Sequence, residues 1–139
     1  MAISLKPTLT LESTGGSYGV SEDASLSLSV TDTLTVKSPF VGISKITCTA
    51  DGTDTEILPS VDITRYVYIK NTGLQSDGTT ATADGTTLKV ETANGYRIID
   101  LAADEFCYFP HHAEAAGILQ LEASAGTVIA EYGYWTKSS

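Results

Sequence analysis

The stretch TRYVYIKN, residues 64–71, decides the fold class of this chain. It is rich in β-branched and aromatic residues, and its side chains alternate with a period of two. This period predicts a strand with one face formed by Arg65, Val67 and Ile69 and the other by Tyr66, Tyr68 and Lys70. Because both faces are largely non-polar, we expect the strand to be covered on both sides, by its own domain or by another copy of the chain.

The same period occurs along most of the sequence. Residues 25–36 (SLSLSVTDTLTV) alternate hydroxyl and aliphatic side chains. In residues 126–137 (GTVIAEYGYWTK), one face is formed by Val128, Ala130, Tyr132 and Tyr134, and the other by Ile129, Glu131 and Trp135. About ten to twelve such short strands predict an all-β protein, an antiparallel β-sandwich with a jelly roll as the leading topology. A single turn at residues 113–116 is the only helical candidate.

Turn residues divide the chain into hairpins. Asp-Gly-Thr occurs three times, and Asp-Gly accepts the positive φ of tight turns, so residues 44–58 are predicted to form a hairpin with its tip near Gly52. Asn94-Gly95 predicts a second hairpin between residues 87–92 and 96–101. Residues 71–86 consist almost entirely of small and polar residues, which predicts a long exposed loop.

The chain of 139 residues fits one compact domain with two parts. Residues 1–38 are rich in Ser and Thr, and we expect an N-terminal β arm or hairpin there, packed on the body or swapped with it. Residues 39–139 are expected to form the sandwich body, and Pro39 is the predicted joint between arm and body.

Charge and hydropathy narrow the function classes. The net charge is −9 and the eight basic residues are dispersed, so we predict no nucleic-acid binding. Such an acidic surface suits a basic protein partner or loosely bound divalent cations. No apolar run approaches the length that spans a bilayer and no leader pattern precedes the first strands, so we predict a soluble chain without membrane contact.

The stretch FCYFPHHAE, residues 106–114, invites a metal or catalytic interpretation. Zinc needs converging ligands, but Pro110 is expected to end a strand and to leave His111 and His112 on a surface loop, away from Cys107. Cys48 and Cys107 are interpreted as buried apolar residues, with a disulfide between them left open. Residues 51–56 (DGTDTE) suggest calcium but lack the EF-hand spacing. We therefore predict no catalytic, metal-binding or cofactor-binding residue, and no enzyme.

The aromatic residues carry the stronger signal. Eight of the eleven lie in three strand segments, and aromatic side chains are enriched where proteins contact each other. Six of them are predicted to form an interaction surface: Tyr66, Tyr68, Tyr108, Tyr132, Tyr134 and Trp135.

The segments TRYVYIKN, IIDLAADEFCYFP and GTVIAEYGYWTKSS resemble strands of small all-β virion proteins of tailed bacteriophages, of the marine and cyanobacterial type. The resemblance covers roughly residues 61–139, and this chain departs from the pattern at His111 and His112. It implies a non-enzymatic structural protein, made in the host cytoplasm and located in the virion at the capsid surface. We expect a decoration or cement protein that binds the major capsid protein or another virion protein, as a homo-oligomer with a trimer favoured.

Two other functions remain open. One is a tail or head fibre, knob or adaptor subunit of the same particle. The other is a carbohydrate-binding β-sandwich that stacks sugars on exposed Tyr and Trp side chains.

Overall fold

The computed structural model describes residues 2–12, 27–37, 42–58, 62–93, 95–113 and 118–137. In this part of the chain the regular elements are twelve strands: β1 (Ala2–Leu5), β2 (Thr8–Glu12), β3 (Ser27–Thr31), β4 (Leu34–Lys37), β5 (Ser44–Thr49), β6 (Thr55–Leu58), β7 (Ile63–Asn71), β8 (Leu88–Thr92), β9 (Arg97–Leu101), β10 (Phe106–Ala113), β11 (Leu119–Ala123) and β12 (Thr127–Thr136). All their pairings are antiparallel. The predicted all-β antiparallel class is confirmed. Among the described residues, no helix has the length and apolarity needed to cross a membrane.

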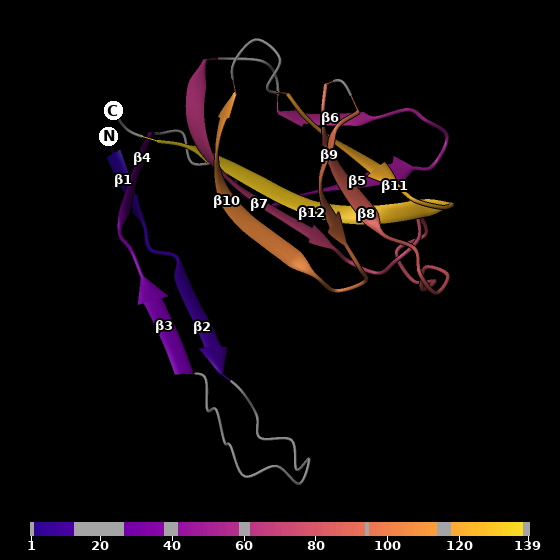
Figure 1. The fold of residues 1–139 in the computed structure, drawn as a ribbon, viewed down its shortest axis with the longest axis horizontal. Helices are drawn as coiled ribbons and strands as arrows, with labels where there is room; N and C mark the ends of the chain where they lie inside the picture. Colours follow the sequence, from indigo (N-terminus) through magenta and orange to yellow (C-terminus); the bar gives the residue numbers. More distant parts are fainter. Residues whose placement is uncertain are drawn as a thin grey trace, which may run out of the picture.

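Two four-stranded sheets form the body (Figure 1). Sheet I has the strand order β10-β7-β12-β5, and sheet II has the order β6-β11-β8-β9. The pairings are nested along the chain: β8 pairs with β9, β7 with β10, β6 with β11, and β5 with β12. Counted outward from the β8–β9 hairpin, the successive pairs therefore belong alternately to sheet II and to sheet I.

The main core lies between the two sheets. Sheet I contributes Val67 and Ile69 from β7 and Val128 from β12, and sheet II contributes Leu119 and Leu121 from β11; all five are fully buried. These residues occupy every second position of their strands, so the period of two in the sequence becomes the inward face of each sheet. The predicted faces of residues 64–71 and 126–137 are correct.

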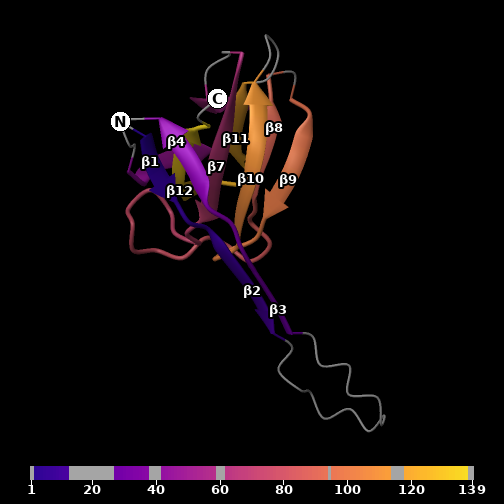
Figure 2. The ribbon, with the colours of Figure 1, turned by 90° about the vertical axis from the view of Figure 1, so that its left-hand side faces the viewer.

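The N-terminal strands form an arm that extends from the body (Figure 1, Figure 2). Strand β1 pairs with β4 at the root of the arm, and β2 pairs with β3 further out. A second, smaller cluster of Val36, Tyr66 and Trp135 holds the root against the outer face of sheet I. Strands β2 and β3 thus form a hairpin within residues 1–38. The domain boundary stays a prediction, and Pro39 lies outside the described residues.

One predicted hairpin is confirmed and the other is wrong. Strands β8 and β9 pair with each other, and Gly95 between them has a φ of +69°, while Asn94 lies outside the described residues. Strands β5 and β6, in contrast, do not pair with each other but belong to sheet I and sheet II, respectively. Their apolar residues face each other across the core, so the turn around Gly52 carries the chain from one sheet to the other instead of closing a hairpin.

The loop of residues 72–87 is exposed at residues 76–81 and 83–85, whereas Thr86 and the last residue of β7, Asn71, are buried. The first part of the loop is fixed to β12, because the Ile129 N–H donates to the Leu74 carbonyl at 2.8 Å and the Thr72 N–H donates to the Ile129 carbonyl at 3.1 Å. The expectation of an exposed loop is therefore correct for residues 76–81 and 83–85 and not for the part packed on β12.

Candidate interaction surface on the outer face of sheet I

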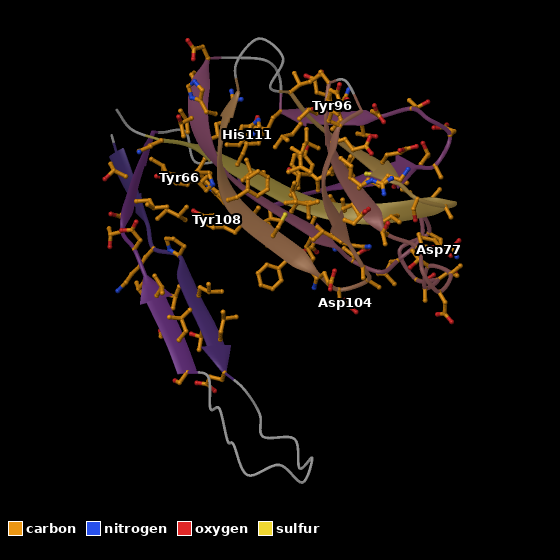
Figure 3. The ribbon with its side chains drawn as sticks, viewed as in Figure 1. Tyr66, Asp77, Tyr96, Asp104, Tyr108 and His111 are labelled. Atoms are coloured by element: carbon orange, nitrogen blue, oxygen red, sulfur yellow. The ribbon has the colours of Figure 1, made fainter. Side chains whose placement is uncertain are left out.

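Aromatic side chains cover the outer face of sheet I beside the root of the arm (Figure 3). Tyr66 of β7 stacks on Tyr108 of β10, with ring centroids 6.3 Å apart and planes 9° from parallel. Tyr68 and Phe106 of the same two strands form a tilted pair at 6.4 Å. Both pairs are diagonal neighbours in the register, which is the arrangement in which large side chains on adjacent strands meet.

A groove lies between these rings and the arm. This aromatic groove has a volume of about 310 Å³ and is lined by Leu5, Lys6, Pro7, Ile43, Tyr68, Tyr108, Glu131 and Trp135. Gly133 makes room beside it: a Cβ there would lie 2.9 Å from Ile43 Cδ1 and 3.3 Å from the Trp135 ring. A larger residue at this position of β12 would therefore displace the end of the Ile43 side chain and require a small shift of the Trp135 ring.

The side chains that line the groove differ in their exposure to solvent. Trp135 is 9% exposed, whereas Tyr108 is 36% and Ile43 is 52% exposed. Burial, followed by the charge of Glu131, raises the pKa of the Tyr68 hydroxyl, so this group stays neutral. Lys45 Nζ lies 3.2 Å from Glu131 Oε1 at the rim. The groove therefore offers apolar and aromatic surface, with its carboxylate already paired.

The structure gathers four of the six predicted interaction residues on this outer face. Tyr66, Tyr68, Tyr108 and Trp135 lie there. The remaining two, Tyr132 and Tyr134, are on the inner face of β12 and pack against the main core, where the Arg65 guanidinium lies 5.3 Å from the centroid of the Tyr134 ring. Their inward position follows from the period of two, because they alternate with Trp135 along β12.

Sequence reasoning missed three apolar contributors to the surface. Leu5 and Ile43 line the groove from segments that are remote in sequence, and Phe106 is 63% exposed beside it. Phe106 belongs to the aromatic segment at residues 106–109, which was the only available signal. Ile43 directly precedes β5 of sheet I, whereas nothing local to Leu5 places that residue near the sheet.

The expectation for the two histidines is wrong. Strand β10 continues through Pro110 to Ala113, so His111 and His112 lie in a strand and not on a loop. β10 is an edge strand, and a proline is tolerated there when its missing N–H would have pointed away from the sheet. His112 Nε2 lies 3.1 Å from Asp62 Oδ1, and its Nδ1 lies 2.9 Å from Thr64 Oγ1, so the start of β7 and the residue before it hold this ring on the sheet surface.

The histidines and Cys107 do not converge on one point. Cys107 and His111 share a strand face but are four positions apart, which corresponds to about 13 Å along an extended chain. His112 alternates to the opposite face. Cys48 and Cys107 are free thiols, and burial raises their pKa to about 12 and about 11, respectively. Cys48 is buried in the main core, as the sequence predicted, whereas Cys107 is only half-buried and packs against that core. Of the predicted helical turn at residues 113–116, Ala113 belongs to β10 and the others lie outside the described residues.

The outer face of sheet II is charged. Asp54, Glu91 and Glu122 place carboxylate oxygens within 4.8 Å of one another, a group that the sequence did not suggest because its members come from separate strands and loops. Lys89 donates to Glu122 at 2.8 Å, and Arg97 Nε lies 3.6 Å from Glu91. These two cations balance two of the three carboxylates. In residues 51–56, where the sequence superficially suggested calcium, Asp51 accepts hydrogen bonds from the Thr49 hydroxyl and the Thr53 N–H. These hydrogen bonds lower the pKa of Asp51.

No protein-family model, no curated protein and no solved structure matches this chain. The class supported at this point is therefore an antiparallel β-sandwich with an extended N-terminal hairpin and an aromatic groove. The resemblance to phage virion proteins remains a prediction.

Proposed function

We propose that this chain is a non-enzymatic structural protein of a bacteriophage virion, a decoration or cement protein that binds the outside of the head. The observation that carries the proposal is the aromatic groove on sheet I. It combines the exposed side chains of Ile43 and Tyr108 with the buried ring of Trp135. A buried aromatic side chain surrounded by more exposed apolar residues is typical of protein-protein contacts.

We infer further that the body is a jelly roll. Its eight strands pair first with last, second with seventh, third with sixth and fourth with fifth, and they alternate between two four-stranded sheets. This nested order is the one expected when a folded-over hairpin is wound into two sheets. Jelly rolls occur in viral capsid proteins and in lectins, so the fold supports the proposal by analogy alone.

The partner that suits the groove is a major capsid protein or another virion protein presenting an apolar anchor. The charged side chains that line the groove are Glu131, which is paired to Lys45, and Lys6, and the other lining residues are uncharged. The remaining acidic charge of the chain, −9 in total, would act at a distance by steering the encounter and not by forming the contact. Many copies on one shell would make a moderate affinity per copy sufficient.

The sugar-binding alternative draws less support. Trp135 is 9% exposed, and Tyr134 packs against the main core, so neither ring presents an open face for a sugar to stack on. The fibre or adaptor alternative shares the same surface and differs only in its place on the particle.

Quantitative mass spectrometry of purified particles tests the proposal. A decoration protein is expected on the order of hundreds of copies per particle, matching the repeated sites of a shell. A few copies would favour the fibre or adaptor alternative. Absence of the chain from particles that carry all other virion proteins would contradict the proposal.

A further inference from the structure

The hairpin β2–β3 presents an apolar face that its own body leaves open. In the register Leu9 is opposite Val30 and Leu11 is opposite Leu28, so these four side chains share one face. Each is between 40% and 52% exposed. Thr8 is opposite Thr31 on the other face. We call the four aliphatic residues the apolar hairpin face.

A two-stranded ribbon is marginally stable on its own in water, because half of its surface lacks a covering layer. The β2–β3 ribbon extends away from both body sheets (Figure 1, Figure 2). The structure thus shows a regular ladder whose apolar face is only partly covered. A partner that covers this face would also stabilise the ladder itself.

A second opening lies where the arm leaves the body. This β10 groove has a volume of about 550 Å³ and is lined by Pro7, Thr8, Leu9, Thr10, Phe106, Cys107 and Tyr108. Residues 7–10 already form one of its walls, so Leu9 of the apolar hairpin face lines this groove, whereas Leu11 and Leu28 are not among its lining residues. The hairpin of the same chain is thus a wall of the groove and not its occupant, and the hairpin of another copy can occupy the opening.

We propose that two copies of this chain associate by placing the apolar hairpin face of each in the β10 groove of the other. The contact is uncharged on both sides: neither the four hairpin residues nor the groove contains a charged side chain. Two chains of net charge −9 repel, so self-association is least opposed where charge is absent. A basic partner, in contrast, would find no carboxylate on this face to recognise.

The available area is sufficient for a reversible complex. Half-exposed aliphatic residues contribute roughly 80 Å² each and Phe106 and Tyr108 somewhat more, so each copy offers about 500 Å² of apolar surface. Two copies would bury about 1,000 Å² in total, which is the lower limit for a specific interface. We therefore expect a dissociation constant in the micromolar range. This inference concerns the free protein, and its contact overlaps the proposed virion-binding surface, because Pro7 and Tyr108 line both grooves.

Sedimentation velocity of the full chain between about 1 and 100 μM tests the inference, and the mean mass is expected to rise with concentration. The double variant Leu11→Asn with Leu28→Asn should weaken association by at least about tenfold. The matched control is Ser27→Asn with Ser29→Asn, which places the same side chains on the opposite face of the same ladder, at positions that do not line the β10 groove. This control is expected to associate like the parent protein.

Two further variants locate the contact. Phe106→Ser changes only the groove and should also weaken association. A mixture of Leu28→Cys and Phe106→Cys chains should form a crosslink between the two variants under mild oxidation, more than either variant alone. Thermal unfolding of the body, unchanged in every variant, shows that folding is intact. A parent protein that is monomeric at all concentrations, equal loss in the control variant, or association that survives Phe106→Ser would each overturn the proposal.

Discussion

Substituting Val36 by Ala tests how the arm is held. Val36 is fully buried in the small cluster with Tyr66 and Trp135, and its strand also bridges to Lys137 after β12. The change removes two methyl groups from a closed site, at about 0.8 kcal/mol each in transfer free energy. Adding the cavity that remains, we expect a loss of about 2 to 3 kcal/mol.

This loss is expected to be local. Val36 lies outside the core between the sheets, so the root of the arm should open while the body stays folded. Hydrogen exchange of amides in β1 and β4 should accelerate by about 30- to 150-fold, because each 1.4 kcal/mol corresponds to a factor of ten. Exchange in β7 and β11 should remain close to that of the parent protein.

Val128→Ala is the matched control, since Val128 is equally buried but lies between the sheets. It should lower the free energy of unfolding of the whole body and reduce Tm by roughly 6 to 9 °C. If Val36→Ala reduces Tm as much as Val128→Ala, or leaves exchange in β1 and β4 unchanged, the arm is not held by a separate cluster and this reasoning is refuted.

Three further predictions concern the body. Asn71→Ala removes a buried amide that donates to the Leu101 carbonyl at 2.9 Å, and urea unfolding should show a loss of about 2 to 4 kcal/mol. Hydrogen bonds within its turn lower the pKa of Asp77 from 3.8 to about 2. These hydrogen bonds should therefore persist at neutral pH and be lost as the pH falls from about 4 toward 2, which amide exchange in that loop would show as faster exchange. Asp77→Asn should abolish this pH dependence. Cys48 and Cys107, with pKa values raised to about 12 and about 11, should resist alkylation near pH 8 until the chain is unfolded by urea.

The local pattern of the sequence predicted local structure well. The period of two placed Val67 and Val128 inside and Tyr66 and Trp135 outside, because alternation is a property of each strand alone. The Asn94-Gly95 turn was equally local. The partners of each strand were not predictable in this way: β5 and β6 are close in sequence, but they belong to different sheets because each finds its ladder with a distant strand.

The candidate site shows the same limit. Proline usually ends a strand, but β10 lies at the edge of sheet I, and only the order of the strands reveals that Pro110 is tolerated there. The groove depends on Leu5 and Ile43, which line it together with the aromatic rings because the root of the arm packs on sheet I. Positions that meet only through long-range pairing leave no pattern in a single sequence.

The most direct test of the proposed function compares two equally exposed isoleucines in binding to particles that lack this chain. Ile43 lines the aromatic groove and is 52% exposed, whereas Ile98 lies in β9 of sheet II and is 48% exposed. In cosedimentation with such particles, Ile43→Ser should weaken binding by about tenfold, because burying half of this side chain contributes about 1 to 1.5 kcal/mol. Ile98→Ser should bind like the parent protein. Equal binding by the two variants, or no binding by the parent protein, would contradict the account.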